Sequence, residues 1–175
     1  MKRVIFVGYM GAGKTTIGKA LSDQLKMTFF DLDWYIEDRF HRKITEIFAE
    51  KGESGFRDIE RNMLHEVAEF ENVIISSGGG TPCFFDNMEY MNQQAMTVYL
   101  KASPEVLCHH LEFGKSKRPL LKDKTEEEML SFITESLKVR EPFYSKAKYI
   151  FNVDPLDTIA DVKQSVGKIV DLLGL

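Results

Sequence analysis

The chain has 175 residues, of which 43% are hydrophobic and 29% charged, a composition typical of a folded globular protein and not of a disordered or fibrous one. Its 23 Lys and Arg against 27 Asp and Glu give a net charge of −4, which argues against a nucleic-acid-binding protein with a basic surface. Two cysteines, Cys83 and Cys108, are too few for a disulfide framework, and no apolar run approaches the ~20 residues that span a bilayer. We therefore expect a single domain, residues 1–175, in a reducing, cytoplasmic setting with no membrane attachment.

Short apolar runs rich in β-branched residues alternate with segments of helical periodicity. In chain order, the pattern predicts strand 2–7, helix 14–26, strand 28–30, helices 34–40, 44–49 and 56–70, strand 73–76, helix 84–94, strand 96–100, helices 104–111 and 126–139, strand 149–153 and helix 157–173. Such alternation predicts an α/β fold with a parallel sheet, in which ligands bind at the carboxyl ends of the strands. Functional residues are therefore expected where the strands end.

The first strand leads into a glycine-rich segment, Gly8-Tyr9-Met10-Gly11-Ala12-Gly13-Lys14-Thr15. It matches the P-loop pattern G-x-x-x-x-G-K-[ST] and stands between a strand and a helix, as that pattern requires. Backbone N–H groups of such a loop converge on phosphate oxygens, and the dipole of the following helix favours negative charge. The segment predicts a nucleotide site, with the lysine on the β- and γ-phosphates and the threonine hydroxyl on Mg²⁺. The candidate nucleotide-binding residues are Gly11, Ala12, Gly13, Lys14, Thr15 and Thr16.

Two acidic residues, Asp31 and Asp33, follow the second strand. Because they are two residues apart, their side chains point to one side of an extended segment, near the predicted phosphate site. An alternative for Asp33 is that it only caps the helix that follows.

Arg57 and Arg140 lie far apart in the sequence, on two segments predicted to be helical. A pair of guanidinium groups is the preferred grip for a planar carboxylate. The alternative for Arg57 is a surface ion pair with Glu60 or Asp58, which contributes little to stability. Three glycines at 78–80 follow the third strand and predict either a sharp turn or a close approach of backbone to a ligand.

Taken together and in order, these features resemble the shikimate kinase family over nearly the whole chain. The matching segments are the P-loop, Asp31-Leu32-Asp33-x-x-Ile36-Glu37, Phe56-Arg57-x-x-Glu60, Gly78-Gly79-Gly80, Arg118-Pro119-Leu120-Leu121 and Arg140-x-x-x-Tyr144. The resemblance implies a P-loop NTPase fold, a three-layer sandwich with a five-stranded parallel sheet flanked by helices and a mobile lid at about 113–124. It also implies transfer of the γ-phosphate of ATP to the 3-hydroxyl of shikimate, with Mg²⁺, in aromatic amino acid biosynthesis, by a monomer.

The resemblance also assigns roles to single residues. Asp33 would hold the acceptor hydroxyl and share the catalytic role with Lys14 and Arg118, the last placed on the phosphates by the lid. Asp31 and, in place of a carboxylate found in other P-loop enzymes, Ser76 would reach Mg²⁺ through water. The acceptor-binding segment would span about 33–61, and the residues that bind the acceptor would be Asp33, Arg57, Gly78, Gly79, Gly80 and Arg140.

The nucleotide end departs from the family at two positions. His110 stands where relatives usually have an arginine against the adenine ring, and Pro155 replaces a residue with a backbone donor. We expect weaker discrimination between ATP and GTP, and tighter ATP binding in His110→Arg, unless His110 points into solvent. Two other functions stay open: a gluconate-type or nucleotide kinase, and a nucleotide-binding regulator without turnover. A zinc site at Cys108-His109-His110 is disfavoured, because adjacent helical side chains diverge by about 100°.

Overall fold

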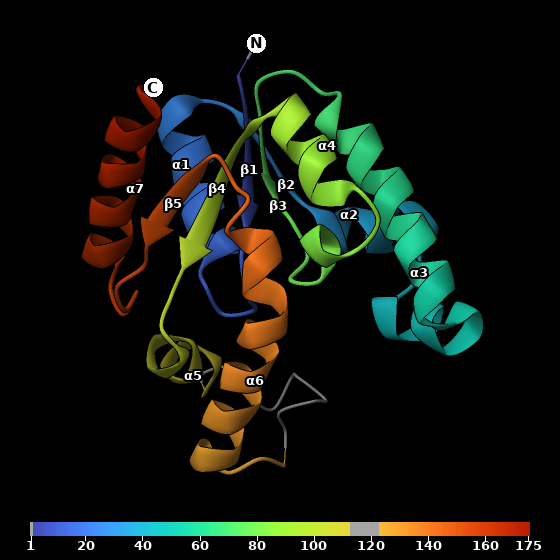
Figure 1. Cartoon of the computed structure of the whole chain (residues 1–175). Coiled ribbons are helices and arrows are strands. Elements are labelled where there is room, and N and C mark those ends of the chain that lie inside the picture. Colours follow the sequence, from blue (N-terminus) through green and yellow to red (C-terminus); the bar gives the residue numbers. More distant parts are fainter. Residues whose placement is uncertain (1, 113–122) are drawn as a thin grey trace.

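A computed structural model describes residues 2–112 and 123–175 of the chain. Its centre is a sheet of five parallel strands in the order β2-β3-β1-β4-β5 (Figure 1). The strands are β1 Arg3–Val7, β2 Thr28–Asp31, β3 Val73–Ser76, β4 Met96–Lys101 and β5 Tyr149–Asn152. The α/β fold and the five-stranded parallel sheet predicted from the sequence are thus confirmed. The predicted lid at 113–124 lies, except for its last two residues, outside the described residues.

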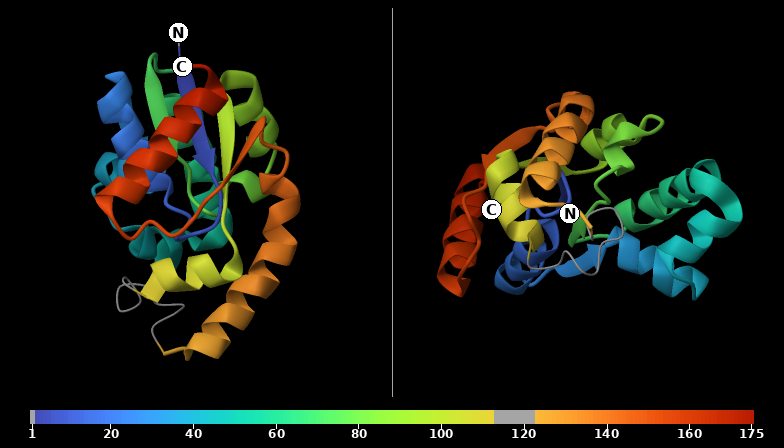
Figure 2. Two further views of the ribbon diagram at one scale, coloured as in Figure 1. Left: turned by 90° about the vertical axis from the view of Figure 1, so that its left-hand side faces the viewer. Right: turned by 90° about the horizontal axis from the view of Figure 1, so that it is seen from below.

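Helices cover both faces of the sheet. They are α1 Lys14–Leu25, α2 Leu32–Phe40, α3 Ile44–Ala68, α4 Asn87–Gln94, α5 Pro104–Glu112, α6 Glu126–Tyr144 and α7 Ile159–Leu173. The pair α1 and α7 packs on one face, and α3 and α4 pack on the other (Figure 2). The helix α5 lies beyond the carboxyl end of β4, where it packs against α6 (Figure 1). This leaves the carboxyl edge of the sheet bordered by loops and by α5.

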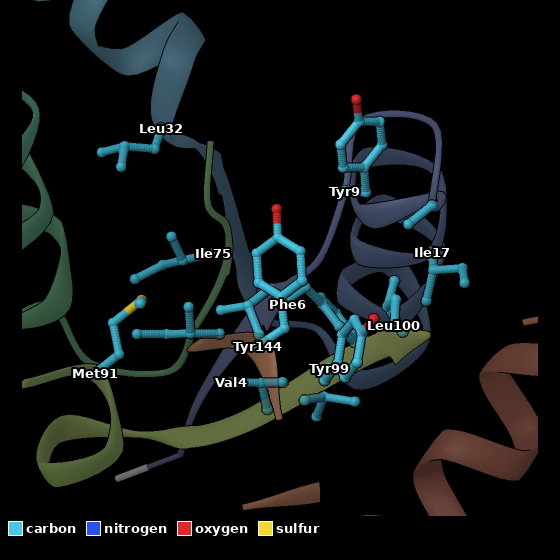
Figure 3. Packing of buried hydrophobic residues seen from close by; sticks show 14 of the residues in the cluster. Val4, Phe6, Tyr9, Ile17, Leu32, Ile75, Met91, Tyr99, Leu100 and Tyr144 are labelled. Carbon is cyan, nitrogen blue, oxygen red and sulfur yellow. The ribbon is translucent and has the colours of Figure 1, made fainter. Parts of the chain in front are cut away.

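The core lies between the central strands and these helices. Val4, Ile5 and Phe6 of β1 are fully buried, because β1 has a paired strand on each side and helices over each face. A strand buried on both faces is apolar throughout, which is why the sequence pattern marks it so clearly. Tyr99 and Tyr144 extend the same cluster toward the carboxyl edge of the sheet (Figure 3).

Helix boundaries differ from the sequence prediction by more than two residues at three places. The predicted helices 44–49 and 56–70 form one element, α3, interrupted at Gly52, whose φ of 69° no longer fits a helix. The helix predicted at 84–94 begins only at Asn87, after a short 3₁₀ turn at Thr81–Cys83. The helix predicted to end at 139 continues to Tyr144, through Pro142, because Tyr144 is buried and anchors its last turn.

Over the residues described, none of the helices is both long enough and apolar enough to cross a membrane.

Candidate active site

A cavity of about 710 Å³ opens at the carboxyl edge of the sheet. It is formed by the P-loop, the ends of β2 and β3, the last turn of α5 and the segment after β5. The lining residues are Met10, Gly11, Gly13, Lys14, Thr15, Thr16, Asp31, Asp33, Ser76, Ser77, Gly78, Gly79, His109, His110, Leu156 and Asp157. Most residues predicted for nucleotide binding thus share one cavity with the acidic pair and two of the three glycines.

The P-loop begins α1 in the way that its sequence predicts. Gly13 occupies the position before the helix with φ of 93°, a backbone conformation that residues other than glycine rarely adopt. The Lys14 ammonium donates to the carbonyl oxygens of Gly8 at 2.8 Å and Tyr9 at 3.0 Å, so the lysine lies folded over its own loop. Ala12 differs from the other predicted residues: its side chain is buried outside the cavity lining, and its N–H donates to the Tyr9 carbonyl.

Thr15 and Asp31 join the P-loop to the end of β2. The Thr15 hydroxyl donates to Asp31 Oδ2 at 2.6 Å, while Asp31 Oδ1 accepts the N–H groups of Asp33 and Trp34. The cap of α2 is therefore Asp31, and the interpretation of Asp33 as a helix cap is wrong. Ser76 pairs with Asp31 in the β2–β3 register, so a carboxylate and two hydroxyls gather beside the P-loop.

Asp33 is held close to the triple-glycine turn, with Oδ1 3.2 Å from where a β-carbon on Gly78 would stand. Burial, together with the nearby carboxylates of Asp31 and Glu60, raises the pKa of Asp33 to about 6, because Lys14 and Arg57 offset these effects only in part. This pKa lies well above the ordinary value of 3.8 for an Asp side chain. At neutral pH this carboxylate is ionised and a better proton acceptor than an exposed Asp.

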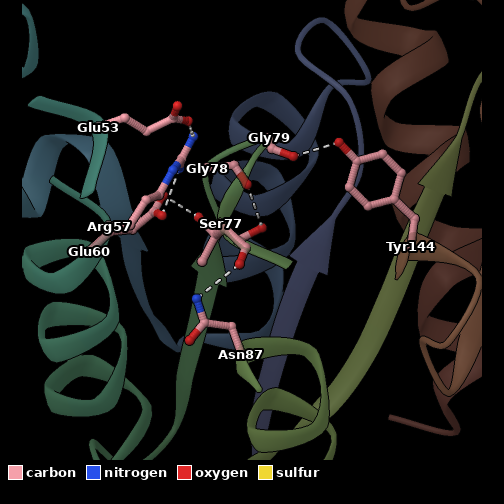
Figure 4. Close-up of polar contacts among 9 residues, drawn as sticks. Glu53, Arg57, Glu60, Ser77, Gly78, Gly79, Asn87 and Tyr144 are labelled. Atoms are coloured by element: carbon pink, nitrogen blue, oxygen red, sulfur yellow. Dashed lines mark hydrogen bonds and ion pairs between the residues drawn. The ribbon is translucent and has the colours of Figure 1, made fainter. Parts of the chain in front are cut away.

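Arg57 and Glu60 form a buried ion pair on α3. Their side chains are 11% and 1% exposed, and Arg57 Nη1 lies 2.8 Å from Glu60 Oε2 (Figure 4). Glu60 Oε1 also accepts the Thr81 hydroxyl at 2.6 Å. The alternative of a surface ion pair for Arg57 is right about Glu60 as the partner, but the pair is buried and does not lie on the surface. The Arg57 Nε–H is buried without an acceptor among the described residues, so the guanidinium keeps an unused donor.

The glycines at 78–80 form the point at which all these side chains meet. A β-carbon on Gly78 would stand 2.9 Å from Glu60 Oε1, one on Gly79 3.4 Å from Arg140 Nη1, and one on Gly80 2.6 Å from Arg57 Nη2. None of the three has a positive φ, so glycine is favoured at 78 and 80 by the lack of space, while a β-carbon at 79 would stand at the edge of ordinary contact. Arg57, Gly80 and Arg140 do not line the cavity themselves but contact the turn that does.

Tyr144, the last residue of α6, holds the Gly79 residue of this turn in place. Its hydroxyl donates to the Gly79 carbonyl at 2.5 Å, from a fully buried ring (Figure 4). Burial raises the pKa of Tyr144 above its ordinary value, so it stays a neutral donor. Arg140 lies one turn earlier on α6, with its guanidinium carbon 5.5 Å from the centre of the Tyr9 ring. The guanidinium groups of Arg140 and Arg57 therefore reach the glycine turn from two different helices.

Two residues that shape the site were not assigned a role from the sequence. Glu60 and Tyr144 stand in the matched segments, but only their burial shows that they hold Arg57 and Gly79 in place.

The adjacent histidines diverge: His109 contacts Asp157, whereas His110 contacts Gly11 and Leu156. His110 therefore does not point into solvent. In the described ranges no three His, Cys, Asp or Glu side chains form a metal cluster. Arg118 lies outside the described residues, and its role stays a prediction.

Comparison with known proteins identifies the family. The family model described as shikimate kinase matches residues 10–173. The chain belongs to the shikimate kinase family. A shikimate kinase of Parabacteroides distasonis is 56% identical over 173 residues, 99% of this chain and 100% of that one. A crystal structure of shikimate kinase from Bacteroides thetaiotaomicron superposes with a TM-score of 0.96 at 53% identity, covering 99% of both chains. A structure of shikimate kinase from Acinetobacter baumannii in complex with shikimate gives a TM-score of 0.83 at 31% identity, covering 99% of this chain and 94% of that one.

Proposed function

We propose that this protein transfers the γ-phosphate of ATP to the 3-hydroxyl of shikimate, giving shikimate 3-phosphate and ADP, in the biosynthesis of aromatic amino acids. The observation that carries the proposal is the meeting of a P-loop, Asp33 and two arginines at one glycine turn in a chain of this family. A phosphoryl donor and a carboxylate-bearing acceptor would then lie on either side of Asp33. The protein acts as a monomer in this proposal.

The P-loop residues would bind the phosphates of ATP. Lys14 lies with its ammonium at the base of the loop, and Gly11, Gly13, Thr15 and Thr16 line the same cavity. The oxygen donors Thr15, Asp31 and Ser76 are the hard ligands that Mg²⁺ prefers, so the residues present fit this ion. When bound there, Mg²⁺ neutralises charge on the phosphates. Arg118 would add a further positive charge.

Arg57 and Arg140 would bind the carboxylate of shikimate. Arg57 has a buried Nε–H with no acceptor among the described residues, and Glu60 holds its other side. The segment 33–61 thus supplies acceptor-binding residues, together with the turn at Gly78, Gly79 and Gly80. A neutral or cationic acceptor would offer no anionic partner to Arg140 or to the Arg57 Nε–H, which favours an acid over a sugar without a carboxylate.

Asp33 would orient the acceptor hydroxyl and take its proton. In the transfer, the hydroxyl oxygen forms a bond to the γ-phosphorus as the bond from that phosphorus to the β,γ-bridging oxygen breaks. The hydroxyl proton passes to Asp33, whose pKa of about 6 makes it ionised yet moderately basic at neutral pH. Because the transition state is loose, positioning contributes more than proton removal, and the proton moves late.

The test is ADP release by the purified protein with MgATP and a panel of acceptors. Shikimate should give turnover, and removal of Mg²⁺ with a chelator should abolish it. Gluconate and nucleoside monophosphates serve as matched alternatives, because a gluconate-type or nucleotide kinase would turn over one of them instead. Tight ATP binding with no ADP release for any acceptor would favour the nucleotide-binding regulator and contradict the proposal.

A further inference from the structure

The ring of His110 connects two segments of the nucleotide end that are far apart in the sequence. Its Nδ1 lies 2.7 Å from the carbonyl oxygen of Gly11 in the P-loop, and its Nε2 lies 2.9 Å from the backbone nitrogen of Leu156. A carbonyl oxygen only accepts and a backbone N–H only donates, so Nδ1 carries the proton and Nε2 carries none. The two contacts together select a neutral imidazole in a single tautomer.

Two leucine side chains also pack directly against glycines of the P-loop. Leu156 Cδ1 lies 2.6 Å from where a β-carbon on Gly13 would stand, and Leu111 Cγ lies 2.8 Å from the corresponding point on Gly11. The P-loop glycines are therefore packed against α5 and against the segment after β5, with no room for larger residues. Gly11, Gly13, His110 and Leu156 all line the cavity, so these contacts define one of its walls.

We infer that His110 is a positioning residue for the nucleotide, whose neutral ring fixes the separation between the P-loop and residues 153–157. The inference rests on the proposed function, because it takes ATP to be the molecule that lies between these two segments. The position demands one donor and one acceptor on the same side chain. A guanidinium group has donors only, so an arginine here would leave the Leu156 N–H without an acceptor. The expectation that His110→Arg tightens ATP binding is therefore reversed.

The first test is ATP affinity, measured by calorimetry without shikimate, in wild type, His110→Phe, His110→Arg and His110→Gln. Loss of these neutral hydrogen bonds should weaken ATP binding about three- to tenfold in the Phe and Arg variants. Gln offers an amide donor and a carbonyl acceptor, and should recover most of the affinity. Shikimate affinity should stay unchanged in all three variants. ATP affinity equal to wild type in His110→Phe would overturn the inference, as would equal losses in the Phe and Gln variants.

The second test uses only the wild-type protein. Nitrogen-15 NMR of the imidazole rings in the ligand-free wild type, at mildly alkaline pH, should show His110 neutral and protonated on Nδ1. A ring protonated on Nε2 would contradict the inference. Neither test uses turnover, so the inference and the proposed function can fail separately. If the proposed function is wrong, the wild-type protein transfers no phosphoryl group to shikimate. If this inference is wrong, His110→Phe binds ATP as tightly as wild type does.

Discussion

The hydroxyl of Tyr144 donates to the carbonyl oxygen of Gly79 at 2.5 Å, although 65 residues separate the two in the chain. The peptide bond between Gly79 and Gly80 is trans and planar, so its N–H points away from its carbonyl. By holding that carbonyl, Tyr144 fixes the direction of the Gly80 N–H. The end of α6 thus orients the glycine turn as well as carrying Arg140, four residues before Tyr144.

We predict that Tyr144→Phe weakens shikimate binding and leaves ATP affinity unchanged. The Phe ring fills the same buried space, so the variant loses only the hydrogen bond to the Gly79 carbonyl. Removing one partner of a buried hydrogen bond costs about 1–3 kcal/mol, part of which should appear as a raised KM for shikimate. Tyr149→Phe, on β5 outside the cavity lining, is the matched control. An unchanged KM for shikimate in Tyr144→Phe would contradict this orienting role.

Arg140→Ala should weaken shikimate binding by roughly tenfold or more, since a hydrogen bond to a charged group contributes about 1.5–3 kcal/mol. Arg57 needs the milder change Arg57→Lys, because an alanine would leave the buried Glu60 carboxylate without its partner and destabilise the fold. Lysine keeps the charge and loses the planar fork. ATP affinity, measured by calorimetry, should change in neither variant.

The control for these substitutions is Arg61→Ala, one turn after Arg57 on α3, whose side chain is partly exposed and pairs with Asp86. It should bind shikimate as wild type does. If Arg140→Ala and Arg57→Lys also bind shikimate normally, the two arginines have only a structural role.

Asp33→Asn should abolish turnover and yet stabilise the ligand-free protein at neutral pH. The folded pKa of about 6 is raised from 3.8, so the ionised form is disfavoured by folding. Wild type therefore loses stability as the pH rises from about 4 to about 6, whereas the Asn variant does not. Thermal unfolding at several pH values measures this, with Asp38→Asn, exposed on the same helix, as the control. If wild type and Asp33→Asn show the same change in stability across this range, the pKa of Asp33 is not raised in the folded protein.

Gly79→Ala should reduce shikimate affinity without unfolding the protein. Its β-carbon would stand 3.4 Å from Arg140 Nη1 and 3.5 Å from the Met10 nitrogen, at the edge of ordinary contact, and Gly79 has no positive φ. The added methyl group would occupy space between Arg140 and the P-loop. Gly167→Ala, in α7 with nothing near its β-carbon, should leave binding unchanged and raise stability by about 0.5–1 kcal/mol. Wild-type shikimate affinity in Gly79→Ala would place the acceptor elsewhere.

The sequence was informative where the physical cause is local. The buried strands appear as apolar runs because both faces of the sheet are covered, and the P-loop is recognisable because its glycines, lysine and threonine act within eight consecutive residues. The proximity of Asp31 to Thr15 also followed from the parallel direction of β1 and β2, whose carboxyl ends lie at the same edge of the sheet although β3 runs between them.

Contacts between distant segments were not predictable in the same way. The burial of Glu60 beside Arg57 depends on how α3 packs over the glycine turn, and the raised pKa of Asp33 depends on that burial. Which aspartate caps α2 is decided by one turn of backbone, which residue type alone does not reveal. The two hydrogen bonds of His110 join it to residues 99 positions before and 46 positions after it in the chain.

The most direct test of the central claim is the structure of the product. Wild-type protein, MgATP and shikimate should yield one phosphate ester, in which NMR shows phosphorus coupled to the proton on carbon 3 of the shikimate ring. Asp33→Asn should form no such ester under the same conditions. A phosphate on another hydroxyl, or ADP formed without any shikimate ester, would contradict the account of how Asp33, Arg57 and Arg140 hold the acceptor.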